Sequence, residues 1–162
     1  MRKLALPIVC ALAPLFGYGQ NSAPEAELIR DDIPPVRDVV RPGVITIAVD
    51  ASDVTRGIFQ VSETIPVPGS GPLVLLYPKW LPGQHAPSGP IAQLAGLKLS
   101  AGGVSLPWRR DSVDVFAFHV AVPEGASNVE AHFQFLAPTD IRQGRIVTTP
   151  DMLNLQWSSV AL

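Results

Sequence analysis

Cysteine is almost absent from this sequence, since Cys10 is the only one among 162 residues. It lies in an N-terminal segment that has the features of a signal peptide, so we expect the mature chain to contain none. An exported domain without disulfides must be held together by its hydrophobic core. Apolar residues make up 47% of the chain, which is enough to build such a core in one domain of this size.

The N-terminus follows the pattern of a secretory signal peptide. Residues 2–3 are basic, residues 4–16 form an apolar run, and small residues stand at Gly17 and Gly19, just before the expected cut. The apolar run is too short to cross a membrane as a helix. We therefore expect residues 1–19 to be removed on export, leaving a periplasmic or secreted protein with no stable membrane anchor.

Charged residues make up only 16% of the sequence, and Lys and Arg form no cluster. Removing Arg2 and Lys3 with the signal peptide leaves 10 Lys and Arg against 14 Asp and Glu, so the mature chain is mildly acidic. A surface that binds nucleic acid needs a basic patch. The composition therefore argues against a nucleic acid as a partner.

The sequence also has no helical periodicity longer than a turn or two. Residues 20–42 combine four prolines with eight charged residues, so they lack the apolar surface needed to fold, and we expect a flexible tether there. From residue 43 onward, short β-branched or alternating runs are separated by turns rich in Gly and Pro. These runs cover residues 44–50, 58–65, 73–77, 104–108, 113–122, 129–135 and 153–157, while residues 91–100 have a helix-compatible start and a strand-like end.

Short strands at regular spacing are typical of antiparallel sandwiches and barrels. We therefore predict that residues 43–162 form an all-β domain, an antiparallel β-sandwich, with Gly102 and Gly103 in the turn of one hairpin. The run from Val160 to Leu162 is still apolar where the sequence stops. On this ground we expect the domain to be incomplete at its C-terminus, as a fragment or as a natural short protein.

Two histidines are the candidate metal ligands, although a weak pair. If residues 123–128 form a hairpin loop, Val122 pairs with Val129 and His119 lies directly opposite His132. Zinc sites use three or four protein ligands, and only two are placed here. Histidines on the polar face of a hairpin more often face solvent, so we predict no metal site in this chain.

A stiff loop over residues 77–90 carries the candidate binding residues. Its prolines and glycines exclude regular structure, and it contains Trp80, Gln84 and His85, which are able to contact a partner. Loops on a rigid β scaffold often hold binding residues. One hypothesis is therefore a recognition loop that binds substrate. The other is a structural crossover in which Trp80 fills the core.

Five segments together resemble the N-terminal domain of the glycyl aminopeptidase family of metallopeptidases, over about residues 43–162. These segments are Pro66–Leu73, Pro78–Gly83, Gly89–Leu97, Leu106–Asp111 and Ala117–Pro123. The resemblance implies a β-rich domain that precedes a thermolysin-like catalytic domain, in which two histidines of a His-Glu-x-x-His motif bind zinc and the glutamate activates its water.

This chain lacks that motif, because His85, His119 and His132 are followed by Ala86, Val120 and Phe133. No catalytic residue can therefore be assigned here, and the resemblance implies an exported, non-catalytic domain. Its expected role is to pack against a catalytic domain, in cis or as a separate chain, and to shape the cleft in which a peptide is cleaved. Zinc is expected in that catalytic domain and no cofactor in this chain. The alternative is a stand-alone secreted module that binds a peptide or a carbohydrate.

Overall fold

The computed structural model describes residues 32–35, 40, 42–138, 140, 148–149 and 151–162. The predicted signal peptide, residues 1–19, and most of the predicted tether, residues 20–42, lie outside these ranges. Every helical segment in the described part is a short 3-10 turn, and none of the helices found there is long and apolar enough to cross a membrane.

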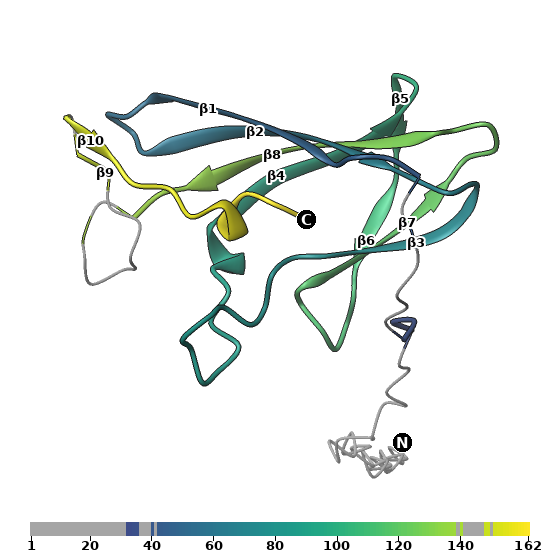
Figure 1. The fold of residues 1–162 in the computed structure, drawn as a ribbon, viewed down its shortest axis with the longest axis horizontal. Helices are drawn as coiled ribbons and strands as arrows, with labels where there is room; N and C mark the ends of the chain where they lie inside the picture. Colours follow the sequence, from purple (N-terminus) through teal and green to yellow (C-terminus); the bar gives the residue numbers. More distant parts are fainter. Residues whose placement is uncertain (1–31, 36–39, 41, 139, 141–147, 150) are drawn as a thin grey trace, which may run out of the picture.

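The larger of the two main sheets has five strands in the order β1-β2-β8-β4-β5, and all neighbours are antiparallel (Figure 1). Its longest pairing joins β2 to β8, where Val61 lies opposite Phe133. The strands are β1 (Thr46–Asp53), β2 (Ile58–Pro66), β4 (Leu94–Ala101), β5 (Val104–Leu106) and β8 (Asn128–Leu136).

The smaller main sheet has three antiparallel strands in the order β3-β7-β6. Its strands are β3 (Gly71–Leu76), β6 (Trp108–Arg110) and β7 (Ala117–Val122). A two-stranded pair, β9 (Thr148–Thr149) with β10 (Met152–Leu153), and two 3-10 turns, η1 (Ile91–Gln93) and η3 (Trp157–Ser159), complete the described elements. The chain is therefore all-β with antiparallel sheets, and the two main sheets face each other as a sandwich, as the sequence predicted (Figure 1).

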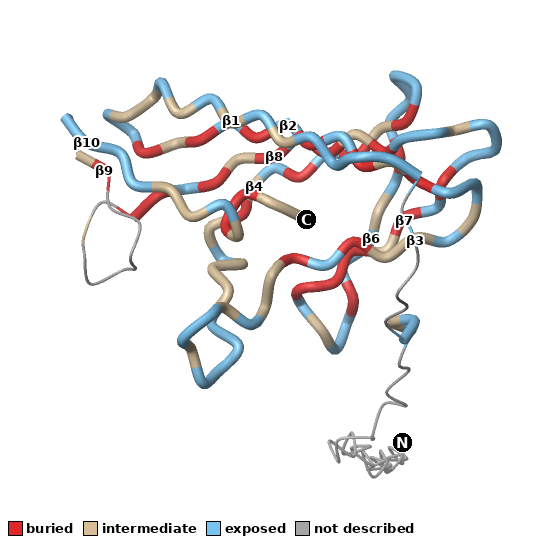
Figure 2. Tube along the Cα trace, viewed as in Figure 1, coloured by how far each residue is buried: buried red, intermediate tan, exposed pale blue. Residues whose placement is uncertain are grey.

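The core lies between the two main sheets and follows the predicted alternation of side chains (Figure 2). Phe118 of the smaller sheet and Phe135 of the larger sheet are both fully buried. The indole of Trp108 lies edge-on to the ring of Phe118, with 5.4 Å between centroids. Its Nε1 also donates a hydrogen bond to the carbonyl oxygen of Leu97 in β4, at 3.1 Å, and so connects the two layers.

Two hairpin predictions had different outcomes. The turn at Gly102 and Gly103 is confirmed, because Ala101 pairs with Val104 and both glycines have positive φ, 56° and 79°, as a two-residue hairpin turn requires. The returning strand, however, is interrupted at Pro107. Proline cannot donate to a ladder, and β5 stays in the larger sheet while β6 belongs to the smaller one.

The predicted hairpin across residues 123–128 is wrong, because β7 and β8 belong to different sheets. Val122 pairs with Gly71, and Val129 pairs with Ile65. The two strands each have one apolar face, and these faces meet across the core instead of lying side by side. Consecutive strands pair or neighbour each other in only about two-thirds of cases, so the local sequence could not decide between these arrangements.

The predicted strand at residues 153–157 is also wrong. Strand β10 ends at Leu153, and the chain then makes the turn η3 and passes inward. Val160 is fully buried and Leu162 packs against the core. Of the residues that alternate in this run, only Leu155 packs against the core, whereas Leu153 and Trp157 are exposed.

Candidate functional site

Two irregular segments meet at one end of the sandwich. We name residues 77–90 the proline loop and residues 154–162 the C-terminal segment. The hydroxyl of Tyr77, at the start of the loop, donates a 2.8 Å hydrogen bond to the carbonyl oxygen of Ser159. Ile91 just after the loop, and Leu155, Val160 and Leu162 in the C-terminal segment, all pack against the core. The two segments therefore cover part of the inner face of the larger sheet beside the smaller sheet (Figure 1).

The base of the proline loop is closed by backbone contacts. The amide of Gly89 donates a hydrogen bond to the carbonyl oxygen of Lys79 at 3.1 Å, and the amide of Tyr77 donates one to the carbonyl oxygen of Phe116 at 2.8 Å. A Cβ atom at Gly89 would lie 1.9 Å from the carbonyl oxygen of Pro78, so only glycine fits this approach. The tip between these contacts is largely exposed, as in a compact Ω-type loop.

The three predicted binding residues all lie on this tip. Trp80 is 62% exposed, so the alternative in which it fills the core is wrong. His85 is exposed and Gln84 is half-buried. Their role in binding remains a prediction.

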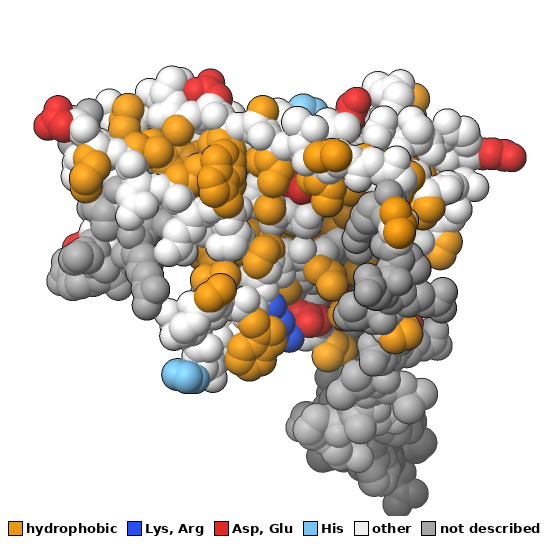
Figure 3. All heavy atoms as spheres, viewed as in Figure 1, with side chains coloured by type: hydrophobic (Ala, Val, Ile, Leu, Met, Phe, Trp, Pro, Cys, Tyr) orange, Lys and Arg blue, Asp and Glu red, His pale blue; other side chains and the backbone are white. Residues whose placement is uncertain are grey.

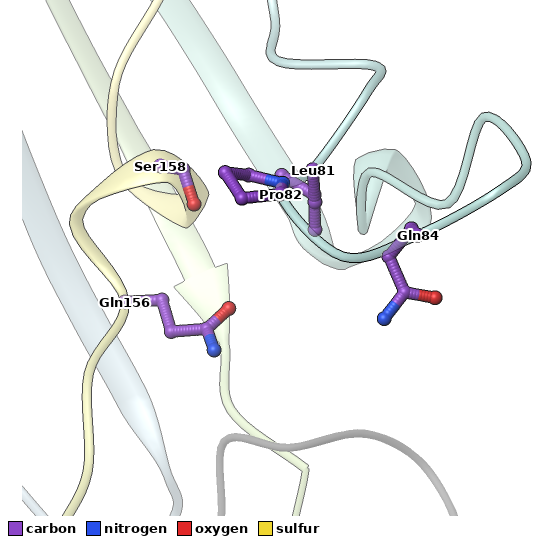
Figure 4. Close-up of a pocket in the computed structure, with 5 residues that line it drawn as sticks. All are labelled: Leu81, Pro82, Gln84, Gln156 and Ser158. Atoms are coloured by element: carbon purple, nitrogen blue, oxygen red, sulfur yellow. The ribbon is translucent and has the colours of Figure 1, made fainter.

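A hollow of about 260 Å³ lies between the loop and the C-terminal segment (Figure 4). Leu81, Pro82 and Gln84 line it from the loop, and Gln156 and Ser158 line it from the C-terminal segment. Trp157, between these last two residues, is 64% exposed. Hydrophobic side chains are spread over the face of the molecule that carries this segment (Figure 3).

The sequence did not indicate Gln156 or Ser158 as part of this site. Both lie in or next to the run that resembled a strand, and their partners in the hollow lie more than 70 residues earlier. No local pattern encodes such a contact.

A polar cluster supports the loop from the side of the smaller sheet. Asp111 accepts hydrogen bonds from the amides of Val113 and Asp114, at 2.8 and 2.9 Å, and contacts Nε2 of His119 at 2.8 Å. These contacts, the two backbone amides first, lower the pKa of Asp111 to about 2. Asp114 in turn pairs with Lys79 of the proline loop at 2.9 Å. The cluster therefore orients the turn at residues 111–117 and connects it to the loop.

The two candidate metal-binding histidines are not brought together. His119 lies in β7, opposite Val74 and Arg109, whereas His132 lies in β8, where its Nδ1 is 3.0 Å from Oγ of Ser62. The cross-strand pairing on which the candidate site depended is wrong. Across the ranges that the structure describes, no group of three or more His, Cys, Asp and Glu residues could hold a metal ion.

Glu63 is a buried acid beneath the C-terminal segment, and the sequence analysis overlooked it. Its side chain is on the inner face of β2, between Val61 and Ile65, and the residue is 2% exposed. Oε2 accepts a 2.9 Å hydrogen bond from the amide of Leu162. Burial raises the pKa of Glu63 to about 7, against the lowering effect of this hydrogen bond. The sequence did contain a signal for this buried acid, because Glu63 stands at one of the alternate positions of β2 that otherwise hold apolar residues.

The family model of the Peptidase M61 N-terminal domain matches residues 46–162. No curated protein matches the chain. One similar solved structure is that of an aminopeptidase N family protein from Idiomarina loihiensis, with 24% sequence identity and a TM-score of 0.49; the match covers 58% of this chain and 15% of that one. The family match covers well over half of the sequence and confirms the predicted resemblance. The chain therefore belongs to the Peptidase M61 N-terminal domain family.

Proposed function

We propose that this chain is the non-catalytic N-terminal β domain of an exported, glycyl aminopeptidase-like metallopeptidase. It packs against a catalytic domain and helps to shape the substrate cleft of that domain. Membership of an N-terminal domain family of peptidases implies a catalytic domain in cis. This sequence contains no His-Glu-x-x-His motif, so zinc and the cleavage step are assigned to that domain.

The observation that carries the proposal is the surface formed by the proline loop and the C-terminal segment. It exposes Trp80 and Trp157, which are 62% and 64% accessible, beside the hollow. Exposed aromatic side chains around a concave apolar site are typical of protein interfaces. Leu162 also lies at this face, so a domain that follows it begins next to this surface (Figure 1).

Export rests on residues 1–19, whose basic start, apolar run and small residues match a signal peptide. The mature protein is accordingly assigned to the periplasm or the extracellular space. N-terminal sequencing of the protein recovered from its native source tests this assignment. A mature N-terminus at or near Gln20 supports export, and a retained Met1 contradicts it.

The packing role is tested in the longer protein encoded by the gene. We expect the reading frame to continue beyond codon 162 into a His-Glu-x-x-His domain. In that protein, Trp157→Glu places a charge on the proposed interface. We expect it to split a single calorimetric unfolding transition into two and to lower kcat/KM for a glycyl peptide substrate. The matched control is Val104→Glu, at the exposed tip of the β4-β5 hairpin, which leaves both measurements unchanged.

Two results would overturn the proposal. One is a gene that ends at codon 162 and a protein that copurifies with no peptidase chain. The other is a Trp157→Glu protein whose unfolding and kcat/KM equal those of the Val104→Glu control.

The hollow also favours the second candidate function, a secreted module that binds a peptide or a carbohydrate. Gln84 and Gln156 present two side-chain amides across it, and amides can pair with peptide groups or sugar hydroxyls (Figure 4). Titration of the exported chain with short peptides and oligosaccharides, followed by the NMR signals of these two amides, tests this function. Unchanged signals at millimolar ligand exclude it.

A further inference from the structure

Glu63 is placed where a charged group is costly. It is one of a row of inward-facing residues on β2 with Phe59, Val61 and Ile65, and its neighbours in the sheet are Ile47 of β1 and Ala131 of β8. Only 2% of the residue is exposed. A carboxylate in such apolar surroundings loses its hydration and prefers the neutral form unless other groups compensate.

The compensation that the structure provides is small. Oε2 accepts one hydrogen bond, from the amide of Leu162 at 2.9 Å. Oε1 is buried and has no hydrogen-bond partner among the described residues. Among the described residues, its burial raises the pKa of Glu63 to about 7, and the hydrogen bond from the Leu162 amide lowers it. The acid is therefore poorly stabilised as an anion.

The charged and titratable groups of the neighbouring elements do not change this balance. On β1, β4 and β8, the residues Asp50, Lys98, Glu130 and His132 alternate away from the buried positions of their strands. Glu130 is held by Oγ of Ser100, at 3.1 Å, and Asp53 bonds to Arg56. In the proline loop, the Tyr77 hydroxyl donates a hydrogen bond to the carbonyl oxygen of Ser159, and burial raises the pKa of Tyr77.

The C-terminal segment itself carries no titratable side chain. If the chain ends at Leu162, the α-carboxyl group of that residue is a second acid close to Glu63, and a like charge there disfavours the anion of Glu63 further. Lys79 of the proline loop is paired with Asp114. Glu63 is therefore the group whose ionisation is coupled to the position of this segment.

We propose that Glu63 is a pH-sensitive latch for the C-terminal segment: the protonated side chain keeps Leu162 seated in the core, and the ionised side chain releases it. On ionisation the proton passes to solvent water as the segment opens, and the carboxylate gains hydration. Because Gln156 and Ser158 line the hollow, release of the segment also takes the hollow apart. This inference goes beyond the proposed function and does not require that a catalytic domain follows.

The direction follows from linkage. A carboxyl group whose pKa is raised in the closed state contributes its full stabilisation below its ordinary pKa of 4.5 and loses it as the pH rises to about 7. Above pH 7 both states are ionised and the loss is complete. With these two values, the closed-to-open ratio of the segment falls by roughly 10- to 400-fold between pH 5 and pH 8.

Amide hydrogen exchange at Leu162 measures this ratio in the intact chain. After correction for the intrinsic pH dependence of exchange, we expect protection of this amide to fall by roughly 10- to 400-fold between pH 5 and pH 8. Glu63→Gln keeps an acceptor for the Leu162 amide but cannot ionise, so its protection stays constant. The matched control Glu130→Gln removes a partly exposed acid from β8 and retains the wild-type profile.

Two further measurements keep the test decisive if Glu63→Gln folds poorly. Tyr77→Phe removes the other anchor of the segment, the bond to Ser159, and lowers protection by the same factor at every pH. In the wild-type chain, the NMR titration of the Glu63 carboxyl carbon should have a midpoint between 5 and about 7, because opening of the segment moves it from the closed-state value of about 7 toward the ordinary 4.5. A midpoint below 5, or an identical pH profile in wild type and Glu63→Gln, overturns the proposal.

Discussion

Replacement of Phe118 by alanine tests the packing between the two sheets most directly. The side chain is fully buried, its ring meets the indole of Trp108 edge-on at 5.4 Å, and the guanidinium of Arg110 lies 5.1 Å from its centroid. Truncation of a core phenylalanine costs about 3–5 kcal/mol, and an edge-to-face aromatic pair contributes about 0.5–1.5 kcal/mol beyond its buried area. We therefore expect a loss in the upper half of that range, about 4–5 kcal/mol.

Urea unfolding followed by far-UV circular dichroism measures this loss as a shift of the midpoint at unchanged slope. Domains of this kind have a total stability of about 5–15 kcal/mol, so Phe118→Ala should lose between about a third and nearly all of it. Val115→Ala, three residues away and exposed, is the control and should change stability by less than about 0.5 kcal/mol. A loss below about 1 kcal/mol for Phe118→Ala would mean that β7 presents its other face to the core.

Two further predictions concern the proline loop and its supporting cluster. Gly89→Ala places a Cβ 1.9 Å from the carbonyl oxygen of Pro78, so the base of the loop must open. Cleavage by proteases within residues 78–88 should therefore accelerate. The control Gly69→Ala, whose Cβ meets no atom within 4 Å, should be cut at the wild-type rate. Equal cleavage rates for Gly89→Ala and Gly69→Ala would contradict the closed base. The second prediction concerns Asp111 in the supporting cluster. Because its pKa is lowered to about 2, its ionised form stabilises the fold above pH 3.8, and this contribution is lost as the pH falls through 2. Unfolding free energies measured from pH 4.5 to pH 2 should fall less steeply in Asp111→Asn than in wild type, and parallel curves would show that the cluster does not act in this way.

The sequence predicted the strands and their faces well, because side-chain alternation is a local property with a period of two residues. The run at residues 58–65 corresponds to β2 (Ile58–Pro66). In the alternating runs 113–122 and 129–135, every second residue from Phe116 and from Val129 is buried. The change from a helix-compatible start to a strand at residues 91–100 appears as η1 followed by β4. The two adjacent glycines, Gly102 and Gly103, likewise predicted a hairpin turn from the local sequence alone.

The pairing of strands could not be predicted in this way, because it depends on contacts between distant residues. β8 pairs with β2 and β4, not with the strand just before it, although the sequence of the connecting turn is compatible with a hairpin. The same limit applies to the hollow and to Glu63, whose contact with Leu162 spans 99 residues. An acid at an apolar position was visible in the sequence of β2, but its partner was not.

The unequal size of the two sheets explains why the candidate site is built from irregular chain. β2 and β8 have nine residues each and β3 and β7 have six, so at about 3.3 Å per residue the larger sheet extends roughly 10 Å beyond the smaller one. Its apolar inner face must be covered there by other means. Proline-rich chain suits this task, because prolines leave fewer backbone donors to be paired.

The sheets are held by ladders of backbone hydrogen bonds. Within the described part of the chain, the C-terminal segment is attached to the rest of the domain by two side-chain hydrogen bonds, Tyr77 with Ser159 and Glu63 with Leu162. Segments with few hydrogen bonds open at a lower free-energy cost than the strands around them. A partner that binds the exposed face of this segment gains contact with Trp157 and stabilises the closed form by mass action. Because Glu63 lies beneath the segment, the closed form binds more protons than the open form between pH 4.5 and about 7. Partner binding and proton binding both favour the closed form, so each should strengthen the other.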